Sequence, residues 1–121
     1  MLARYVAAHD SGDLGALTAL LREDARLVMP PFRGWYAGRS VVVQMAALGF
    51  DPELGHLRGL PTGANSQPAV AWYLRRADET EHRPLALDVL RIEDQRITEI
   101  TTFASSELFS TFELPPTLAA Q

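Results

Sequence analysis

The fold of this chain is decided by residues 84–103, which read PLALDVLRIEDQRITEITTF. Apolar and β-branched residues dominate Pro84–Glu93 and Arg96–Phe103, and the Asp94-Gln95 pair between them is a two-residue turn signal. We therefore predict two strands that pair antiparallel in a hairpin. Because a sheet covered on one face alternates apolar-in and polar-out, we also predict that four apolar side chains are largely buried: Val70, Leu87, Val89 and Ile97.

Weaker strand signals precede this hairpin. Residues 67–75 alternate loosely between two faces, and residues 56–62 are a weaker candidate. Residues 25–29 form a short apolar run that ends at Pro30-Pro31, where a strand would reach an edge or a turn. The stretch 77–83 is polar and is expected to connect two strands. These segments extend the predicted sheet beyond the hairpin.

Helical patterns occupy the first part of the chain. The first 24 residues predict two helices separated by Ser11-Gly12-Asp13, with Asp13 as the N-cap of the second. Ser40 is placed to cap a third helix, Val41–Leu48, that closes at Gly49, although three consecutive valines leave a strand open there. Near the end of the chain, four apolar residues before Pro115-Pro116 predict a short helical turn: Leu108, Phe109, Phe112 and Leu114.

Helices followed by an antiparallel meander indicate an α+β domain with segregated layers. The length of 121 residues fits a single domain, residues 1–121. A curved sheet packed on three helices can enclose a cavity between the layers. Polar residues on the inward face of the sheet are therefore the candidates for function.

Composition excludes several classes of function. The formal charge of −4 and the pI near 5.3 lack the basic footprint of a nucleic-acid-binding domain. The absence of cysteine removes disulfides and thiolate zinc sites, and the 11 basic residues are all arginine, which removes a Schiff-base lysine. No apolar run approaches the ~18 residues that span a bilayer, and the start lacks a signal peptide. We expect a soluble, cytoplasmic protein without direct contact to nucleic acid or membrane.

Asp88 is the main candidate for chemistry, because nearly every neighbour in its strand is apolar. A period of two places it on one face with Ala86, Leu90 and Ile92. A carboxyl group facing a dry cavity could act as a general acid or base. The alternative is a carboxylate that pairs with an arginine or faces solvent.

The histidines and aromatic residues give weaker signals. His82 lies in the polar connector and is expected at the surface, His9 falls near the end of the first helix, and His56 is expected to be packed or at the surface. Their spacing matches no zinc motif, so we expect no metal. Trp35-Tyr36 and Trp72-Tyr73 are paired aromatics that suit either core packing or a ligand pocket. Motifs for nucleotide binding and for a nucleophile elbow are absent, so no cofactor is expected.

Several stretches of the chain resemble the SnoaL-like domains of the NTF2-like superfamily. They are the opening helix pair with Asp10 and Asp13 and the strand that runs from Arg26 through Met-Pro-Pro-Phe to Trp35. Three more resemble the C-terminal extension of actinobacterial extracytoplasmic-function (ECF) sigma factors. These are residues 61–69, residues 87–103 and the tail from Leu108-Phe109 to Pro115-Pro116.

The resemblance implies a cone in which three helices pack on a curved, mixed, largely antiparallel sheet. Such a cone would gather five residues around one cavity: Met29, Trp35, Trp72, Asp88 and Phe103. The family context implies contact with sigma-factor core regions or RNA polymerase, a small apolar ligand, and a homodimer through the exposed sheet face. Without a basic recognition helix, the chain itself is not expected to bind promoter DNA.

Enzymes of the superfamily use cavity carboxylates as acids or bases, and this chain departs from their pattern. Residues 103–106 read FASS, without the aspartate that many related chains place there. Asp88 and Arg91 fall on opposite faces of one strand, so they cannot form adjacent members of an epoxide-hydrolase site. The leading hypothesis is therefore a non-catalytic, ligand-sensing regulatory domain of a sigma factor. The alternative is a small enzyme using acid–base catalysis as a polyketide cyclase, a ketosteroid isomerase or an epoxide hydrolase.

Overall fold

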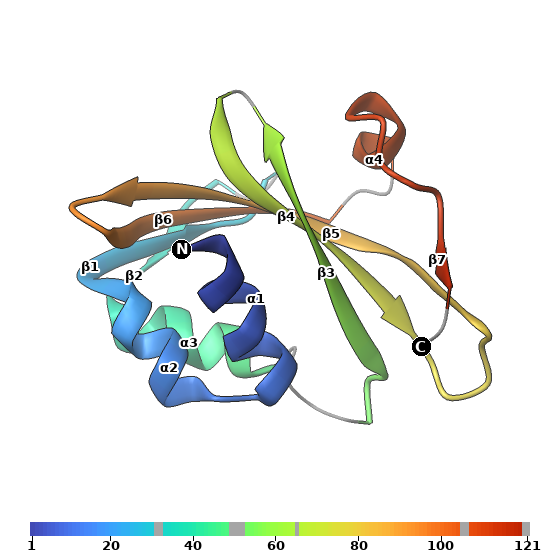
Figure 1. The fold of residues 1–121 in the computed structure, drawn as a ribbon. Helices are drawn as coiled ribbons and strands as arrows, with labels where there is room; N and C mark the ends of the chain where they lie inside the picture. The colour runs from blue at the N-terminus through green and yellow to red at the C-terminus, as the bar shows by residue number, and fades with distance from the viewer. Residues whose placement is uncertain (31–32, 49–52, 65, 105–106, 120–121) are drawn as a thin grey trace.

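The structure is a computed structural model that describes residues 1–30, 33–48, 53–64, 66–104 and 107–119. Within these ranges the chain forms four helices and seven strands (Figure 1). In chain order they are α1 (Leu2–Ser11), α2 (Leu14–Leu20), β1 (Leu21–Val28), β2 (Trp35–Ala37), α3 (Arg39–Ala47), β3 (His56–Ala64), β4 (Gln67–Arg75), β5 (Glu81–Glu93), β6 (Arg96–Phe103), α4 (Glu107–Thr111) and β7 (Leu118–Ala119).

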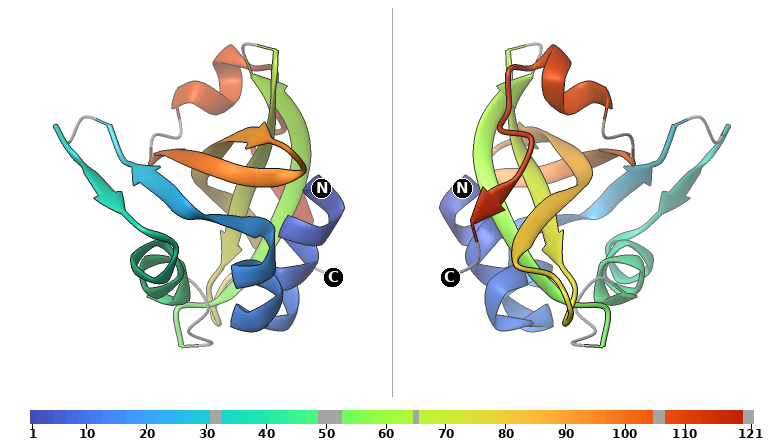
Figure 2. Two further views of the ribbon diagram at one scale, coloured as in Figure 1. Left: turned by 90° about the vertical axis from the view of Figure 1, so that its left-hand side faces the viewer. Right: turned by 90° about the vertical axis from the view of Figure 1, so that its right-hand side faces the viewer.

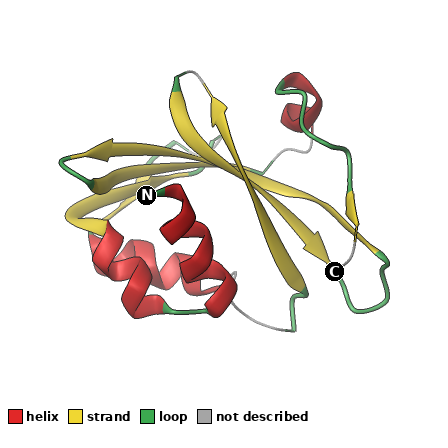
Figure 3. Ribbon diagram, viewed as in Figure 1, coloured by secondary structure: helices red, strands yellow, loops and turns green. Residues whose placement is uncertain are grey.

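The strands form one mixed sheet in the order β2-β1-β6-β5-β4-β3, and β7 adds a short pairing to β5. The β1–β6 pair is parallel and the other pairs are antiparallel. The sheet is strongly bent, and α1, α2 and α3 lie together on its concave side (Figures 1 and 3). The predicted α+β class, with three helices in the first half of the chain, is confirmed.

The hairpin of β5 and β6 has the predicted bounds at its turn. Glu93 pairs with Arg96, and Asp94 and Gln95 between them have φ values of 51° and 64°. Two consecutive residues with positive φ form the type of turn whose twist matches the right-handed twist of the flanking strands. The turn sets the pairing of Glu93 with Arg96, and a shift of one residue between Arg91 and Ile92 then places Asp88 opposite Thr102.

Extra residues in the strands bend the sheet. Trp72 on β4 pairs with Ala86 and Tyr73 with Pro84, so Leu85 is one residue in excess on β5. Arg91 on β5 pairs with Glu99 and Ile92 with Ile97, so Thr98 is in excess on β6. Such bulges increase the local twist and kink the strand that carries them.

Both faces of the sheet are covered near its centre. On the concave face, Val70 and Ile97 are fully buried among residues of α1, α2 and α3. On the outer face, Leu87 and Val89 are buried against Phe109 of α4. Figure 2 shows α4 and the three N-terminal helices on different sides of the sheet. The four predicted core residues are confirmed, but the segment that contains α4 and β7 supplies the cover for two of them.

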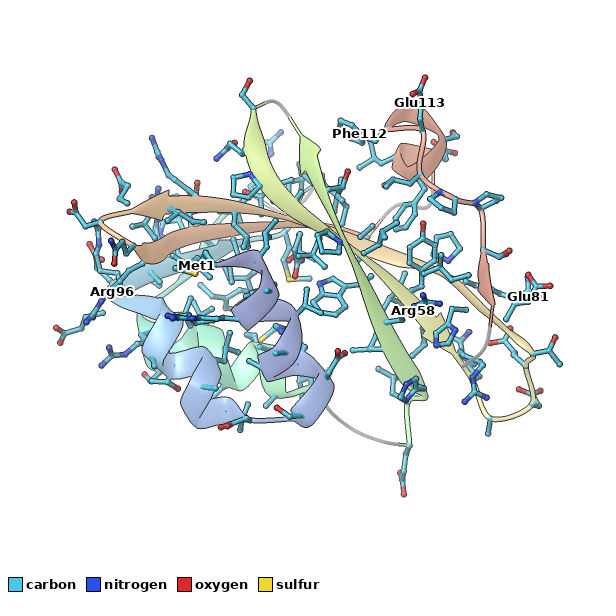
Figure 4. The ribbon with its side chains drawn as sticks, in the orientation of Figure 1. Met1, Arg58, Glu81, Arg96, Phe112 and Glu113 are labelled. Carbon is cyan, nitrogen blue, oxygen red and sulfur yellow. The ribbon has the colours of Figure 1, made fainter. Side chains whose placement is uncertain are left out.

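A ring contact and a hydrogen bond help to hold the carboxy-terminal segment on the outer face, in addition to the pairing of β7 with β5. Phe109 meets Tyr73 edge to face, with ring centroids 5.1 Å apart, and the Tyr73 hydroxyl donates to the backbone oxygen of Pro115 (2.7 Å). Phe112 lies on the side of α4 toward the sheet, whereas Glu113 points away from it (Figure 4). The predicted helical turn thus covers the apolar cluster on the outer face of the sheet, which includes Leu87, Val89 and Tyr73.

Several element boundaries differ from the prediction, most clearly at the starts of β1, α3 and β5. The second helix ends at Leu20, because Leu21 pairs with Ile97 of β6 and starts β1 four residues early. The third helix begins at Arg39, where the Gly38 carbonyl accepts from Val42 N, so Ser40 is not the cap. Strand β5 begins at Glu81 within the expected connector, because β7 pairs with its first residues.

The short edge strand β2 carries no signal in the sequence, because all three of its residues are exposed. The Asp13 cap is confirmed, since its carboxylate accepts from Ala16 N (3.0 Å). Some residues quoted from the sequence lie outside the described ranges: Pro31, Phe32, Gly49, Asn65, Ser105 and Ser106.

Replacing Gln95 with glycine is expected to stabilise the domain by about 0.5–1 kcal/mol. A side chain in the left-handed region is strained, and glycine is not. The free energy of unfolding in urea measures the change. The control is Arg96→Gly at the first residue of β6, where the backbone is extended and glycine should destabilise. A loss of stability in both variants would contradict the turn geometry.

Candidate functional site

A cavity of about 290 Å³ lies between the concave face of the sheet and helices α1 and α3. Its walls are mostly apolar and include Leu27, Met29, Val42, Met45, Leu57 and Ile100. Its polar groups come from five residues on four elements: Tyr5, His9, Trp72, Asp88 and Thr102. An apolar chamber with a few converging polar groups is the usual form of a small-molecule site.

Asp88 lies at the centre of these five polar residues. Its Oδ2 accepts from the Tyr5 hydroxyl (2.8 Å) and from Trp72 Nε1–H (2.8 Å). Its Oδ1 accepts from the Thr102 hydroxyl (2.6 Å). The residue is 7% exposed, and these three hydrogen bonds offset the cost of burying a carboxylate.

The strand register brings these partners together. Asp88 pairs with Thr102 on β6 and with Val70 on β4, so Trp72, two residues along β4, shares its face. Tyr5 reaches the carboxylate from the first turns of α1. The Asp88 carboxylate therefore ties one helix to three strands.

Gly59 makes room for the indole ring. It pairs with Trp72 across β3 and β4, and a Cβ atom at this position would lie 2.8 Å from Cζ3 of that ring. Such an approach is too close for any side chain. The glycine thereby lets Trp72 lie across β3 with Nε1–H at hydrogen-bond distance from Asp88.

His9 packs between two aromatic rings at the same end of the cavity. Its ring centroid lies 4.5 Å from that of Tyr5 and 4.6 Å from that of Trp72. Burial lowers the pKa of His9 below its ordinary value, against smaller opposing effects of the Tyr5 carbonyl and two carboxylates. Burial and the charge of Asp88 together raise the pKa of Tyr5 well above its ordinary value. Tyr5 therefore remains a neutral phenol that donates to Asp88.

Three of the five residues predicted for the pocket line this cavity: Met29, Trp72 and Asp88. Trp35 does not, because it pairs with Val28 at the sheet edge, is 61% exposed and lies against the Arg26 guanidinium, 5.5 Å from the ring centroid. Phe103 does not either, because it pairs with Leu87 and packs in the outer cluster. In both cases the side chain lies on the face of the sheet opposite to the predicted one, because successive residues of a strand point to opposite faces.

The histidine expectations also change. His82 was expected at the surface and is 1% exposed, because β5 extends to Glu81 and β7 pairs with it there. Its ring lies 5.8 Å from that of His56, beside a separate hollow that Asp10 and Arg58 also line. His9 belongs to the cavity rather than to the solvent-exposed end of α1.

Tyr5, His9, Thr102 and Gly59 are site residues that sequence reasoning missed. The sequence carried one usable signal, the spacing of four between Tyr5 and His9, which puts both on one face of a helix. Within the described ranges, no cluster of three or more His, Asp or Glu residues could hold a metal ion. The described helices include none that is long and apolar enough to cross a membrane.

No protein-family model matches the sequence. The chain is 36% identical over 121 residues to the ECF RNA polymerase sigma factor SigG of Mycobacterium tuberculosis, in two strains. The match covers 98% of this chain and 32% of the sigma factor, so the chain spans about a third of the length of that relative.

Solved structures define the fold. A putative ketosteroid isomerase from Kribbella flavida matches with a TM-score of 0.69 at 20% identity, over 86% of this chain and 74% of that one. An NTF2-like protein of unknown function from Burkholderia xenovorans matches with a TM-score of 0.67 at 15% identity, over 86% and 79%. The chain has the NTF2-like fold. The predicted fold and the predicted resemblance to ECF sigma factors are both confirmed.

In this NTF2-like domain, Asp88→Ala is expected to lower the free energy of unfolding by about 2–5 kcal/mol. The change leaves the buried donors of Tyr5 and Trp72 without an acceptor. Asp88→Asn should cost less, because the amide oxygen can accept from both donors while the amide nitrogen donates to Thr102. Urea denaturation of both variants measures the difference, and equal losses would contradict the network.

The lowered pKa of His9 predicts a dependence of stability on pH. The unfolded chain takes up this proton near pH 6.5 and the folded protein only at lower pH, so stability is full above about pH 6.5 and falls as pH decreases below it. The slope contributed by one group is at most about 1.4 kcal/mol per pH unit. His9→Phe keeps an aromatic ring without a titrating group and should flatten the profile between pH 6.5 and the lowered pKa. An unchanged profile would show that His9 is not responsible.

Proposed function

We propose that this chain is a non-catalytic, ligand-sensing regulatory domain of an ECF-type sigma factor. Two findings support the proposal: identity to an ECF sigma factor along nearly the whole chain, and an apolar cavity with one polar end. The observation that carries it is the state of Asp88. Its carboxylate already accepts three hydrogen bonds from the protein, as in an anchoring group.

A general base must take a proton from the substrate, which needs a lone pair aimed at the reacting atom. Tyr5, Trp72 and Thr102 occupy most of the acceptor capacity of Asp88. Asp88 is also the only carboxylate among the described residues that line the cavity. The arrangement supports binding and positioning rather than proton transfer.

A small acid–base enzyme is the second candidate. It is favoured by one observation: a carboxylate, a phenol and an imidazole converge in an apolar cavity of the fold shared with a putative ketosteroid isomerase. Turnover of a steroid-like ketone, a polyketide or an epoxide, lost in Asp88→Asn, would decide for this candidate. The regulatory proposal expects no turnover in either protein.

The proposed partners are the core regions of the sigma factor or RNA polymerase, in the cytoplasm, where these assemble. A homodimer through the exposed part of the sheet belongs to the same proposal. In both cases the ligand would act by changing the packing of α1 and α3, which line the cavity and reach the surface. The domain 1–121 is proposed to act as one unit.

A cavity-filling variant tests the proposal. Ala46 of α3 lines the cavity, so Ala46→Phe should abolish the rise in melting temperature that small apolar compounds give to the natural protein. Gln44→Phe, on the exposed side of the same helix, is the matched control and should keep the response. In a sigma factor that carries this domain, an identified ligand should change transcription in vitro, and Ala46→Phe should remove that effect. No response to any compound would contradict the proposal.

A further inference from the structure

The polar end of the cavity has hydrogen-bond acceptors to offer and few donors. Trp72 has a single N–H, and it points to Asp88. The hydroxyls of Tyr5 and Thr102 each have one hydrogen, and both hydrogens point to the same carboxylate. These three groups have therefore no hydrogen left for a ligand, whereas both hydroxyl oxygens and Asp88 Oδ1 can accept another hydrogen bond.

The protonation state of His9 also affects the polarity of this end of the cavity. Its Nδ1 lies 2.9 Å from the backbone oxygen of Tyr5, which can only accept, so Nδ1 carries the hydrogen. Burial lowers the pKa of the ring, which keeps it neutral at neutral pH and makes Nε2 an acceptor. The neutral imidazole therefore brings no positive charge to this end of the cavity.

The charge of the cavity points in the same direction. No ion pair between described residues involves Asp88, and the described lining includes neither lysine nor arginine. A buried carboxylate without a cation attracts a positive group strongly. The rings of Tyr5 and Trp72, with centroids 6.2 Å apart, line the cavity beside the carboxylate and add contact surface for the body of a ligand.

We propose that the cavity binds a small apolar amine, whose ammonium group donates to Asp88 Oδ1 while its hydrocarbon body packs on Met29, Val42 and Ile100. The inference rests on the proposed function, because it assumes that the cavity is a ligand site. A ketone would set an acceptor against acceptors, and a carboxylate would add a second negative charge beside Asp88. The cavity therefore favours a ligand that donates hydrogen bonds over a carbonyl compound, which could only accept them.

Four probes with one hydrocarbon body test the inference: naphthylmethylamine, naphthylmethanol, acetylnaphthalene and naphthoate. Isothermal titration calorimetry on the unmodified chain should give the order amine, alcohol, ketone, carboxylate. We expect the amine to bind at least about tenfold more tightly than the ketone, since a charge-assisted hydrogen bond replaces an unfavourable contact. A ketone or carboxylate that binds as tightly as the amine would overturn the inference and leave the ligand-binding proposal standing. Failure of every probe to bind would count against both.

A pair of variants assigns the preference to Asp88. Asp88→Asn removes the charge, and the second amide hydrogen becomes a donor, so the amine should weaken by at least about tenfold and the ketone should gain. Asp78→Asn makes the same change in an exposed turn and should leave all four affinities unchanged. Equal weakening of the amine in both variants would show a non-specific charge effect and overturn the inference. If Asp88→Asn does not fold, the order of the probes on the unmodified chain still decides.

Discussion

The arrangement of the concave side of this domain depends on the buried carboxylate of Asp88. A buried charge is tolerated only when it is hydrogen-bonded, and hydrogen bonds to a charged group contribute about 1.5–3 kcal/mol each. Here the donors come from α1, β4 and β6, so the carboxylate keeps the helix at a fixed distance from the sheet. Any rearrangement that separates these elements leaves at least one buried polar group without a partner. Three hydrogen bonds consequently hold the polar end of the cavity in place, and most of the remaining wall is apolar.

The sequence revealed this residue but not its partners, for a physical reason. Asp88 stands out because period two puts it among apolar neighbours on an inward face, a purely local pattern. Tyr5 and Thr102 look like ordinary helix and strand residues, and only the packing of α1 against the sheet and the register of β5 against β6 make them donors. Local patterns likewise predicted the β5–β6 hairpin and its turn at Asp94-Gln95, but not the extra residue at Thr98 that sets the register at Asp88. By contrast, Trp35 and Phe103 were placed wrongly, because their positions depend on an edge strand and a strand phase that the sequence does not mark.

The same division explains why β4 looked ambiguous. Residues 69–74 are all buried, which hides the alternation that normally identifies a strand with one exposed face. Ala69, Ala71 and Tyr73 are buried under the segment containing α4, a partner far along the chain. Ala69 and Ala71 belong to the same buried cluster as Phe109. The burial of this face therefore follows from a long-range contact with α4. The sequence predicts α4 only as a local apolar pattern and does not show what it packs against.

The two bulges have a consequence for how such a cavity can change. Over matched spans, β5 is one residue longer than β4 and β6 is one residue longer than β5, at Leu85 and Thr98. From Leu21 to Arg26, β1 then takes five steps while β6 takes two, from Ile97 to Glu99. Strands of unequal contour length that stay hydrogen-bonded cannot lie flat, so the sheet buckles towards the helices and a hollow opens. The size of that hollow therefore depends on the number of extra residues in each strand. A deletion or insertion at positions 85 or 98 would resize the chamber in discrete steps, whereas substitutions only resurface its walls.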